Sequence, residues 1–146
     1  MNILTGEFHH QIDEKGRLRI PSKFKEYMGT DPMVIRGSSG CLMLMPKEKG
    51  EALLSRIFSG DNLSETNRTR AMRIILSGVD YLEEDKQGRV QINSKLLAKV
   101  GIEKNIVTIG ANDRAEIWSE EKWEEYLNDE SQPDFDECLR SLSENV

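Results

Sequence analysis

Two arginines in the sequence occupy the same local setting, in which a guanidinium group could bind nucleic acid. Residues 13–17 read Asp-Glu-Lys-Gly-Arg, and residues 85–89 read Asp-Lys-Gln-Gly-Arg. Glycine accepts a positive φ and aspartate hydrogen-bonds to nearby backbone, so each run predicts a tight turn. Arg17 and Arg89 follow these turns directly. Because arginine offers a rigid fork of donors that fits guanine and phosphate oxygens, a contact with nucleic acid is one chemistry that this pattern allows.

Other basic side chains lie near the two arginines and could extend an electropositive face. The lysines among them would contact backbone phosphate, which positions a protein without reading base sequence. The alternative for Arg17 is a structural one, in which it only pairs with Asp13 across the turn. The predicted DNA-binding residues are Lys15, Arg17, Arg19, Lys23, Lys86, Arg89 and Lys95, and the signature turn residues are Asp13, Gly16, Asp85 and Gly88.

The two turns belong to a longer internal repeat. Residues 13–29 and 85–101 align at an offset of 72, with seven of seventeen positions identical. The second copy has Gln87 and Gln91 where the first has Lys15 and Arg19, so its role in binding DNA is less strongly indicated. Each copy covers about 45 residues, which is too few to bury a secure core alone. We therefore expect the two copies to pack together and share one core.

Each repeat predicts a strand, a turn, a second strand and a short helix. After the first turn, Arg17 and Arg19 alternate with Leu18 and Ile20, which places the arginines on one strand face and the apolar residues on the other. Pro21 suits the first turn of a helix. Apolar residues at helical spacing follow in both copies. Two hairpins are expected at residues 33–46 and 105–118, because short apolar runs flank turn residues there.

This doubled Asp-Xaa-Xaa-Gly-Arg unit resembles the swapped-hairpin domain of the AbrB/SpoVT transcription factors. Two copies with a helical spacer closely resemble the MraZ family of bacterial regulators of the division and cell-wall gene cluster. The resemblance implies an α+β, mainly β fold, in which two AbrB/SpoVT-like swapped-hairpin repeats form a pseudo-two-fold β core with flanking helices. The expected divisions are repeat 1 at 5–49, a helical linker at 50–77, repeat 2 at 78–121, and a C-terminal helix with an acidic tail at 122–146.

The resemblance also implies a function and partners. The expected function is sequence-specific binding of double-stranded DNA at promoter repeats by a ring-shaped homo-oligomer. Such a regulator would repress the division and cell-wall gene cluster, including its own gene. The alternative is an antitoxin-like or structural protein-interaction module without promoter specificity. No enzyme activity is expected, because Ser, Cys, His and carboxylate residues form no catalytic motif, and Asp13 and Asp85 are each explained by their own turn.

The helical segments carry apolar faces. A helix at 47–59 would have Leu53, Leu54, Ile57 and Phe58 on one side, and a second, with Ser64 as its N-cap, would bury Met72, Ile75 and Leu76. This helical pair is a candidate subunit interface. A third helix at 119–127 has Ser119 as its expected N-cap, and a short final helix would contain Leu139 and Leu142.

Charge is distributed unevenly along the chain. The net charge is −6, but residues 119–146 hold ten acidic and two basic side chains, whereas residues 1–118 hold sixteen acidic and eighteen basic ones. Binding depends on the local field near phosphate, so the overall sign does not exclude DNA. A single chain with such a small positive excess should bind weakly, which favours several copies acting together.

The remaining composition predicts no metal site, no cofactor and no membrane segment. His9 and His10 are adjacent in a predicted strand, so they should face opposite sides. Cys41 is expected to be buried and Cys138 to be a free thiol. We find no signal peptide pattern and no long apolar run, and expect a cytoplasmic, nucleoid-associated protein.

Overall fold

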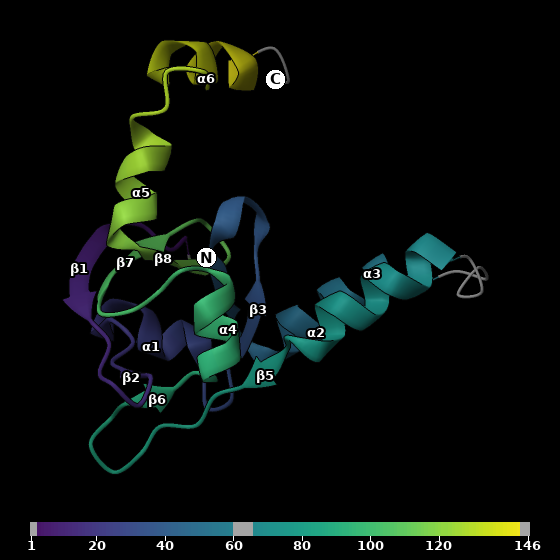
Figure 1. Cartoon of the computed structure of the whole chain (residues 1–146), viewed down its shortest axis with the longest axis vertical. Coiled ribbons are helices and arrows are strands. Elements are labelled where there is room, and N and C mark those ends of the chain that lie inside the picture. Colours follow the sequence, from purple (N-terminus) through teal and green to yellow (C-terminus); the bar gives the residue numbers. More distant parts are fainter. Residues whose placement is uncertain (1–2, 60–65, 144–146) are drawn as a thin grey trace.

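A six-stranded antiparallel sheet forms the centre of the computed structural model, which describes residues 3–59 and 66–143 (Figure 1). The strand order is β1-β7-β8-β4-β3-β5. These strands are β1 (Glu7–Gln11), β3 (Met33–Arg36), β4 (Leu42–Met45), β5 (Asp80–Tyr81), β7 (Asn105–Gly110) and β8 (Ala115–Ser119). Strands of the two repeats are therefore interleaved in one sheet, with β1 beside β7, β8 beside β4 and β3 beside β5. The expected α+β, mainly β fold with one core shared by both repeats is confirmed.

Two short strands after the signature turns form a separate ladder that relates the repeats by a pseudo-two-fold axis. β2 (Arg17–Leu18) pairs antiparallel with β6 (Val90–Gln91), with Arg17 opposite Gln91 and Leu18 opposite Val90. Leu18 and Val90 are equivalent positions at the repeat offset of 72. Because these two equivalent residues lie directly opposite each other in the ladder, the pseudo-two-fold axis that relates the repeats passes between them. The swapped arrangement thus brings the two turns to one end of the molecule.

The main core is built from equivalent positions of the two repeats. The strand residues Leu18 and Ile20 are buried as the alternation predicts, while the neighbouring arginines stay partly or fully exposed. The short helices α1 (Ser22–Met28) and α4 (Ser94–Lys99) cover this core. Equivalent buried pairs are Leu18 and Val90, Ile20 and Ile92, Phe24 and Leu96, and Met28 and Val100. Each repeat supplies half of one apolar interior, which neither could close alone.

Both predicted hairpins are present. β3 and β4 are joined by the 3-10 turn η1 (Ser38–Gly40), and β7 and β8 by a turn in which Asn112 has a φ of 72°. Strand β1 begins at Glu7, directly after Gly6, which has a φ of 102°. Leu4 reaches the sheet only through an isolated bridge to Asn112. His9 and His10 contact different partners, Glu7 and Thr108 respectively, as expected for opposite strand faces.

The helical pair is less buried than its sequence predicts. Helices α2 (Lys47–Ile57) and α3 (Thr66–Ser77) extend together from the body (Figure 1). Near the sheet, Leu53, Leu54 and Ile75 pack against a small cluster of Met33, Ile35 and Met45. Leu76 remains 41% exposed, so the prediction that it is buried was wrong, and Ile57, on the apolar side of α2, is 47% exposed. Leu76 lies on a different side of α3 from Ile75, and Ile57 lies at the outer end of α2. The predicted N-cap Ser64 lies outside the described residues.

Two further helices follow the sheet and extend away from it (Figure 1). Helix α5 (Glu120–Leu127) begins at the predicted N-cap, where the Ser119 side chain accepts a hydrogen bond from the Lys122 backbone. Trp118, Trp123 and Tyr126 form an aromatic cluster at its base. Helix α6 (Phe135–Ser143) is the predicted final helix. Within residues 3–59 and 66–143, no helix is long and apolar enough to cross a membrane.

Candidate nucleic-acid interface

Each signature turn is closed by its aspartate in the same way. Oδ1 of Asp13 accepts hydrogen bonds from the backbone nitrogens of Lys15 and Arg17, at 2.9 and 2.8 Å. Oδ1 of Asp85 accepts from the corresponding nitrogens of Gln87 and Arg89, at 2.8 and 2.9 Å. These bonds from backbone N–H groups are the main cause of a lowered pKa at both carboxyl groups, since they favour the charged form. The repeated sequence therefore yields two turns of one geometry.

The glycine in each turn is required by the backbone conformation. Gly16 and Gly88 both have a φ of 77°, in the left-handed region that L side chains rarely adopt. At Gly16 the surroundings add a second restriction, because a Cβ would lie 2.6 Å from the Ile92 carbonyl oxygen. At Gly88 a Cβ would meet the flexible end of the Arg19 side chain at 3.3 Å. The first turn is thus packed directly against the backbone of the second repeat.

The two arginines are oriented by carboxylates and keep part of their surface open. Nε of Arg17 lies 2.7 Å from Oδ2 of Asp13, and Nε of Arg89 lies 3.2 Å from Oδ2 of Asp85. Nη1 of Arg89 also lies 3.7 Å from Oδ2 of Asp13. The arginine side chains are 30% and 23% exposed. Each salt bridge engages Nε, so the carboxylate holds the guanidinium in one orientation while part of the arginine side chain stays exposed to solvent.

Each aspartate closes its own turn as predicted, and Asp13 makes a further contact that the sequence did not predict. Asp13 accepts from the arginine of its own turn and also faces Arg89 of the other turn. The swapped pairing of β2 with β6 brings these groups together although they are far apart in sequence. The result is a small charged cluster at the pseudo-two-fold axis, which repeat spacing alone does not reveal.

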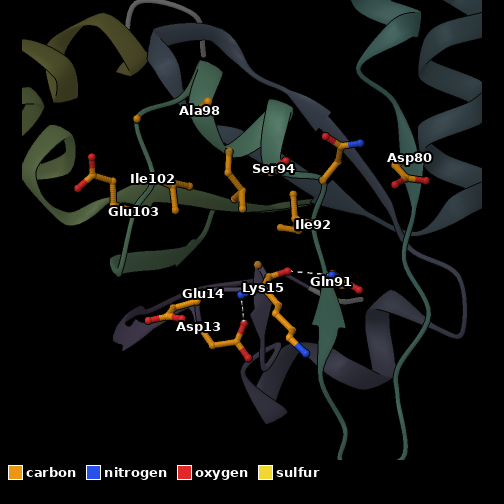
Figure 2. A pocket seen from close by; sticks show the side chains of 14 residues that line it. Asp13, Glu14, Lys15, Asp80, Gln91, Ile92, Ser94, Ala98, Ile102 and Glu103 are labelled. Atoms are coloured by element: carbon orange, nitrogen blue, oxygen red, sulfur yellow. Dashed lines mark hydrogen bonds between the residues drawn. The ribbon is translucent and has the colours of Figure 1, made fainter.

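A reciprocal pair of side-chain hydrogen bonds fixes one turn against the other. Nη1 of Arg19 donates to the Gln87 carbonyl at 2.5 Å, and Nε2 of Gln91 donates to the Lys15 carbonyl at 2.8 Å. Arg19 and Gln91 are equivalent positions at the repeat offset, and so are Lys15 and Gln87. Figure 2 shows the Gln91 contact with Lys15 as a dashed line. The glutamine in the second copy therefore preserves the contact, although it lacks the charge.

The predicted lysines are exposed, with different local partners. Lys15, Lys86 and Lys95 lie on the surface. Nζ of Lys23 donates to the Thr5 hydroxyl at 3.1 Å. The structure also brings in Lys104, which the sequence prediction omitted. Its backbone carbonyl accepts from Ile12, and it lines a cleft with the turn arginines.

Two clefts flank the paired turns and differ in charge. One, of about 580 Å³, is lined by Arg17, Arg19, Arg89 and Lys104 together with several carboxylates. The other, of about 800 Å³, is lined by Asp13, Glu14, Asp80 and Glu103, with Lys15 as its basic side chain (Figure 2). Polyanions are repelled by concentrated carboxylates, so the arginine-lined side is the better place for phosphate.

Taken together, the interleaved strands, the pseudo-two-fold ladder and the matched turns define a duplicated swapped-hairpin protein. Comparison with known proteins agrees with this class. A family model described as "MraZ protein, putative antitoxin-like" matches residues 3–74 and again residues 75–142. The chain belongs to the MraZ family.

Curated relatives match the chain over nearly its full length. A protein of Lactobacillus helveticus named transcriptional regulator MraZ is 37% identical over 97% of this chain and 98% of its own. Proteins of the same name from Clostridium tetani and Heliobacterium modesticaldum are 38% and 35% identical, covering 97% and 96% of this chain and 98% and 96% of theirs. These names describe regulators of transcription, and none describes an enzyme.

Proposed function

We propose that this chain is a transcriptional regulator that binds double-stranded DNA through its paired signature turns. The observation that carries the proposal is the placement of Arg17 and Arg89 in matched, interlocked turns at one end of the β core. Guanidinium groups held by carboxylates lose little freedom when they bind, which favours contact with guanine or phosphate. The relatives named as transcriptional regulators support this function.

The surrounding basic residues extend this interface. Lys15, Lys23, Lys86 and Lys95 would contact backbone phosphate and so position the turns. Arg19 contributes positive charge and also holds the second turn in place through the Gln87 carbonyl. The second turn retains Arg89 and its geometry, so we propose that it takes part in binding together with the first.

At a finer level, we propose that copies of the chain form a ring that binds repeated promoter sites. The excess of basic over acidic residues outside the C-terminal segment is small, so one copy offers little electrostatic affinity. Joining several weak sites raises the overall affinity strongly when their spacing matches the DNA repeats. The target would be the promoter of the division and cell-wall gene cluster, including the chain's own gene, with repression as the outcome. Action on that promoter would make the protein nucleoid-associated in the cytoplasm.

A mobility-shift titration on the chain's own promoter fragment tests the interface. Arg17→Ala and Arg89→Ala should each weaken binding at least tenfold and reduce the dependence of the binding constant on salt, because fewer phosphate contacts release fewer counterions. Arg70→Ala is the matched control, since Arg70 is an exposed arginine of α3 outside the turns. Thermal unfolding of each variant checks that the fold is intact.

The same titration separates the alternative function. An antitoxin-like or structural module would bind promoter and unrelated DNA alike, or neither. Binding that stays unchanged in both turn variants, with folding intact, would remove the proposed interface. Preference for the promoter that disappears in the Arg17 variant would exclude the alternative.

A further inference from the structure

The final helix presents an apolar face that no described residue covers. Phe135, Leu139 and Leu142 follow one another at helical spacing and are 76%, 49% and 66% exposed. Residues at this spacing share one side of a helix. Asp136 lies beside this face, and Glu137 lies on the opposite side of the helix. The helix thus has the composition of a docking segment with an acidic residue at one edge of its apolar face.

A groove of complementary character lies between α2 and the β3–β4 hairpin. It has a volume of about 600 Å³, and Met43, Met45, Leu53 and Ile57 supply its apolar lining. Its basic lining residues are Arg36, Lys49, Arg56 and Arg114. Asp113 is its acidic lining residue, and it already faces Arg114 at 3.8 Å. An apolar floor with a basic rim is suited to an amphipathic helix with an acidic edge.

We propose that α6 of one copy docks in this groove on a second copy. Charge complementarity supports the pairing, because α6 and its first-turn cap carry Asp134, Asp136 and Glu137 against one basic residue, Arg140, while the groove is predominantly basic. Complementary charge sets the orientation and excludes wrong partners, and apolar contact supplies affinity. Docking would cover Phe135 and Leu142 against side chains such as Ile57, which is itself 47% exposed.

The position of α6 within one chain favours a second copy as the occupant. In Figure 1, α6 lies beyond α5, and the helical pair extends from a different side of the sheet. The docking helix and the groove are different surfaces, so the contact is head-to-tail. Contacts of this kind generate a ring when the rotation between copies closes. The inference rests on the proposed assembly of copies into a ring and assigns it a specific contact.

Sedimentation or light scattering of full-length variants tests the contact. Arg36→Glu with Arg56→Glu should lower the mass of the assembly, and so should Leu139→Ser with Leu142→Ser. A mixture of these two doubly substituted chains should give a heterodimer, because one retains a working helix and the other a working groove. Arg70→Glu on α3 and Glu137→Lys on the opposite side of α6 are the controls, and both should keep the wild-type mass.

A charge exchange adds a test that does not depend on loss alone. Asp136→Lys should lower the mass, and combining it with Arg56→Glu should restore it in part. Masses equal to the wild type in both doubly substituted chains would overturn the inference, as would a monomeric wild type, in which α6 could contact only its own chain. The Arg17 dependence of DNA binding is measured separately, so this contact can fail while the proposed function stands.

Discussion

Nη1 of Arg89 lies 3.7 Å from Oδ2 of Asp13, so the arginine of the second repeat contacts the aspartate of the first. The same aspartate oxygen also lies 2.7 Å from Nε of Arg17. The first signature turn therefore orients both arginines of the proposed DNA interface. Asp85 of the second turn pairs with Arg89. Asp13 thus contacts two arginines and Asp85 contacts one, although the two aspartates are equivalent positions of the repeats.

Replacing Asp13 should destabilise the protein more than replacing Asp85. Asp13→Ala removes the acceptor for two backbone N–H groups and for Nε of Arg17, and it also removes the ion-pair partner of Arg89. Asp85→Ala removes the acceptor for two backbone N–H groups and for Nε of Arg89. Thermal unfolding should give the order wild type, then Asp85→Ala, then Asp13→Ala, from highest to lowest melting temperature. Equal melting temperatures for the two variants would show that the contact between repeats contributes nothing.

The role of Arg19 can be separated into charge and position. Arg19→Gln places in the first repeat the residue found at the equivalent position of the second, where Gln91 donates to the Lys15 carbonyl. If Arg19 acts mainly by positioning the Gln87 turn, Arg19→Gln should retain most of the DNA affinity that Arg19→Ala loses. Fluorescence anisotropy on a labelled promoter fragment measures both. A loss of equal size in the two variants would instead indicate a direct phosphate contact.

The two turn glycines share a φ of 77° but should differ in their tolerance of alanine. A left-handed backbone costs an alanine about 1–2 kcal/mol. Gly88→Ala should lose about this amount, because its added Cβ would meet only the flexible ends of the Arg19 and Lys25 side chains, at 3.3 and 3.5 Å. Gly16→Ala should lose more, because its Cβ would lie 2.6 Å from the Ile92 carbonyl oxygen. Chemical denaturation of the two variants checks this order, and a Gly16→Ala loss no larger than that of Gly88→Ala would contradict it.

The contact between β1 and α5 should weaken as pH rises. Hydrogen bonds from His9 to Glu7 and Glu120 raise the histidine pKa above its ordinary value of 6.5. Because the His9 pKa is higher in the folded state than in the unfolded state, protonation of His9 stabilises the fold. This stabilisation is fully present below the pKa of the unfolded state and is lost as pH rises through the pKa of the folded state. The pKa of the half-buried His10 shifts in the opposite direction, because burial disfavours the charged form of its ring.

Comparison with a His9→Gln variant isolates this effect from that of His10. The melting temperature of the wild type should exceed that of the variant at about pH 5.5, and the difference should shrink by about pH 8.5, since only protonated His9 pairs with the carboxylates. Thermal unfolding followed by circular dichroism at both pH values measures it. A difference that stays constant with pH would show that His9 contributes through packing alone.

The limits of sequence reasoning are clear at the helical pair. Apolar periodicity located α2 and α3 but did not show which positions would meet the sheet. Ile57 and Leu76 match the apolar pattern and are exposed, because Ile57 lies at the outer end of α2 and Leu76 lies on a different side of α3 from Ile75, which packs against the sheet. Periodicity identifies a face that would benefit from burial, and the partner that covers it depends on the packing of distant elements.

The sequence by itself determined the structure of each signature turn, because the aspartate, the glycine and the backbone they organise lie within five residues. It also determined the alternation that buries Leu18 and Ile20, and, through the repeat, a core shared by two halves. Only the tertiary structure decided that Arg89 faces Asp13, that Arg19 reaches the Gln87 carbonyl and that Lys104 joins the arginine-lined cleft. These contacts join residues that are distant in the chain, and their register follows from how strands of the two repeats pair.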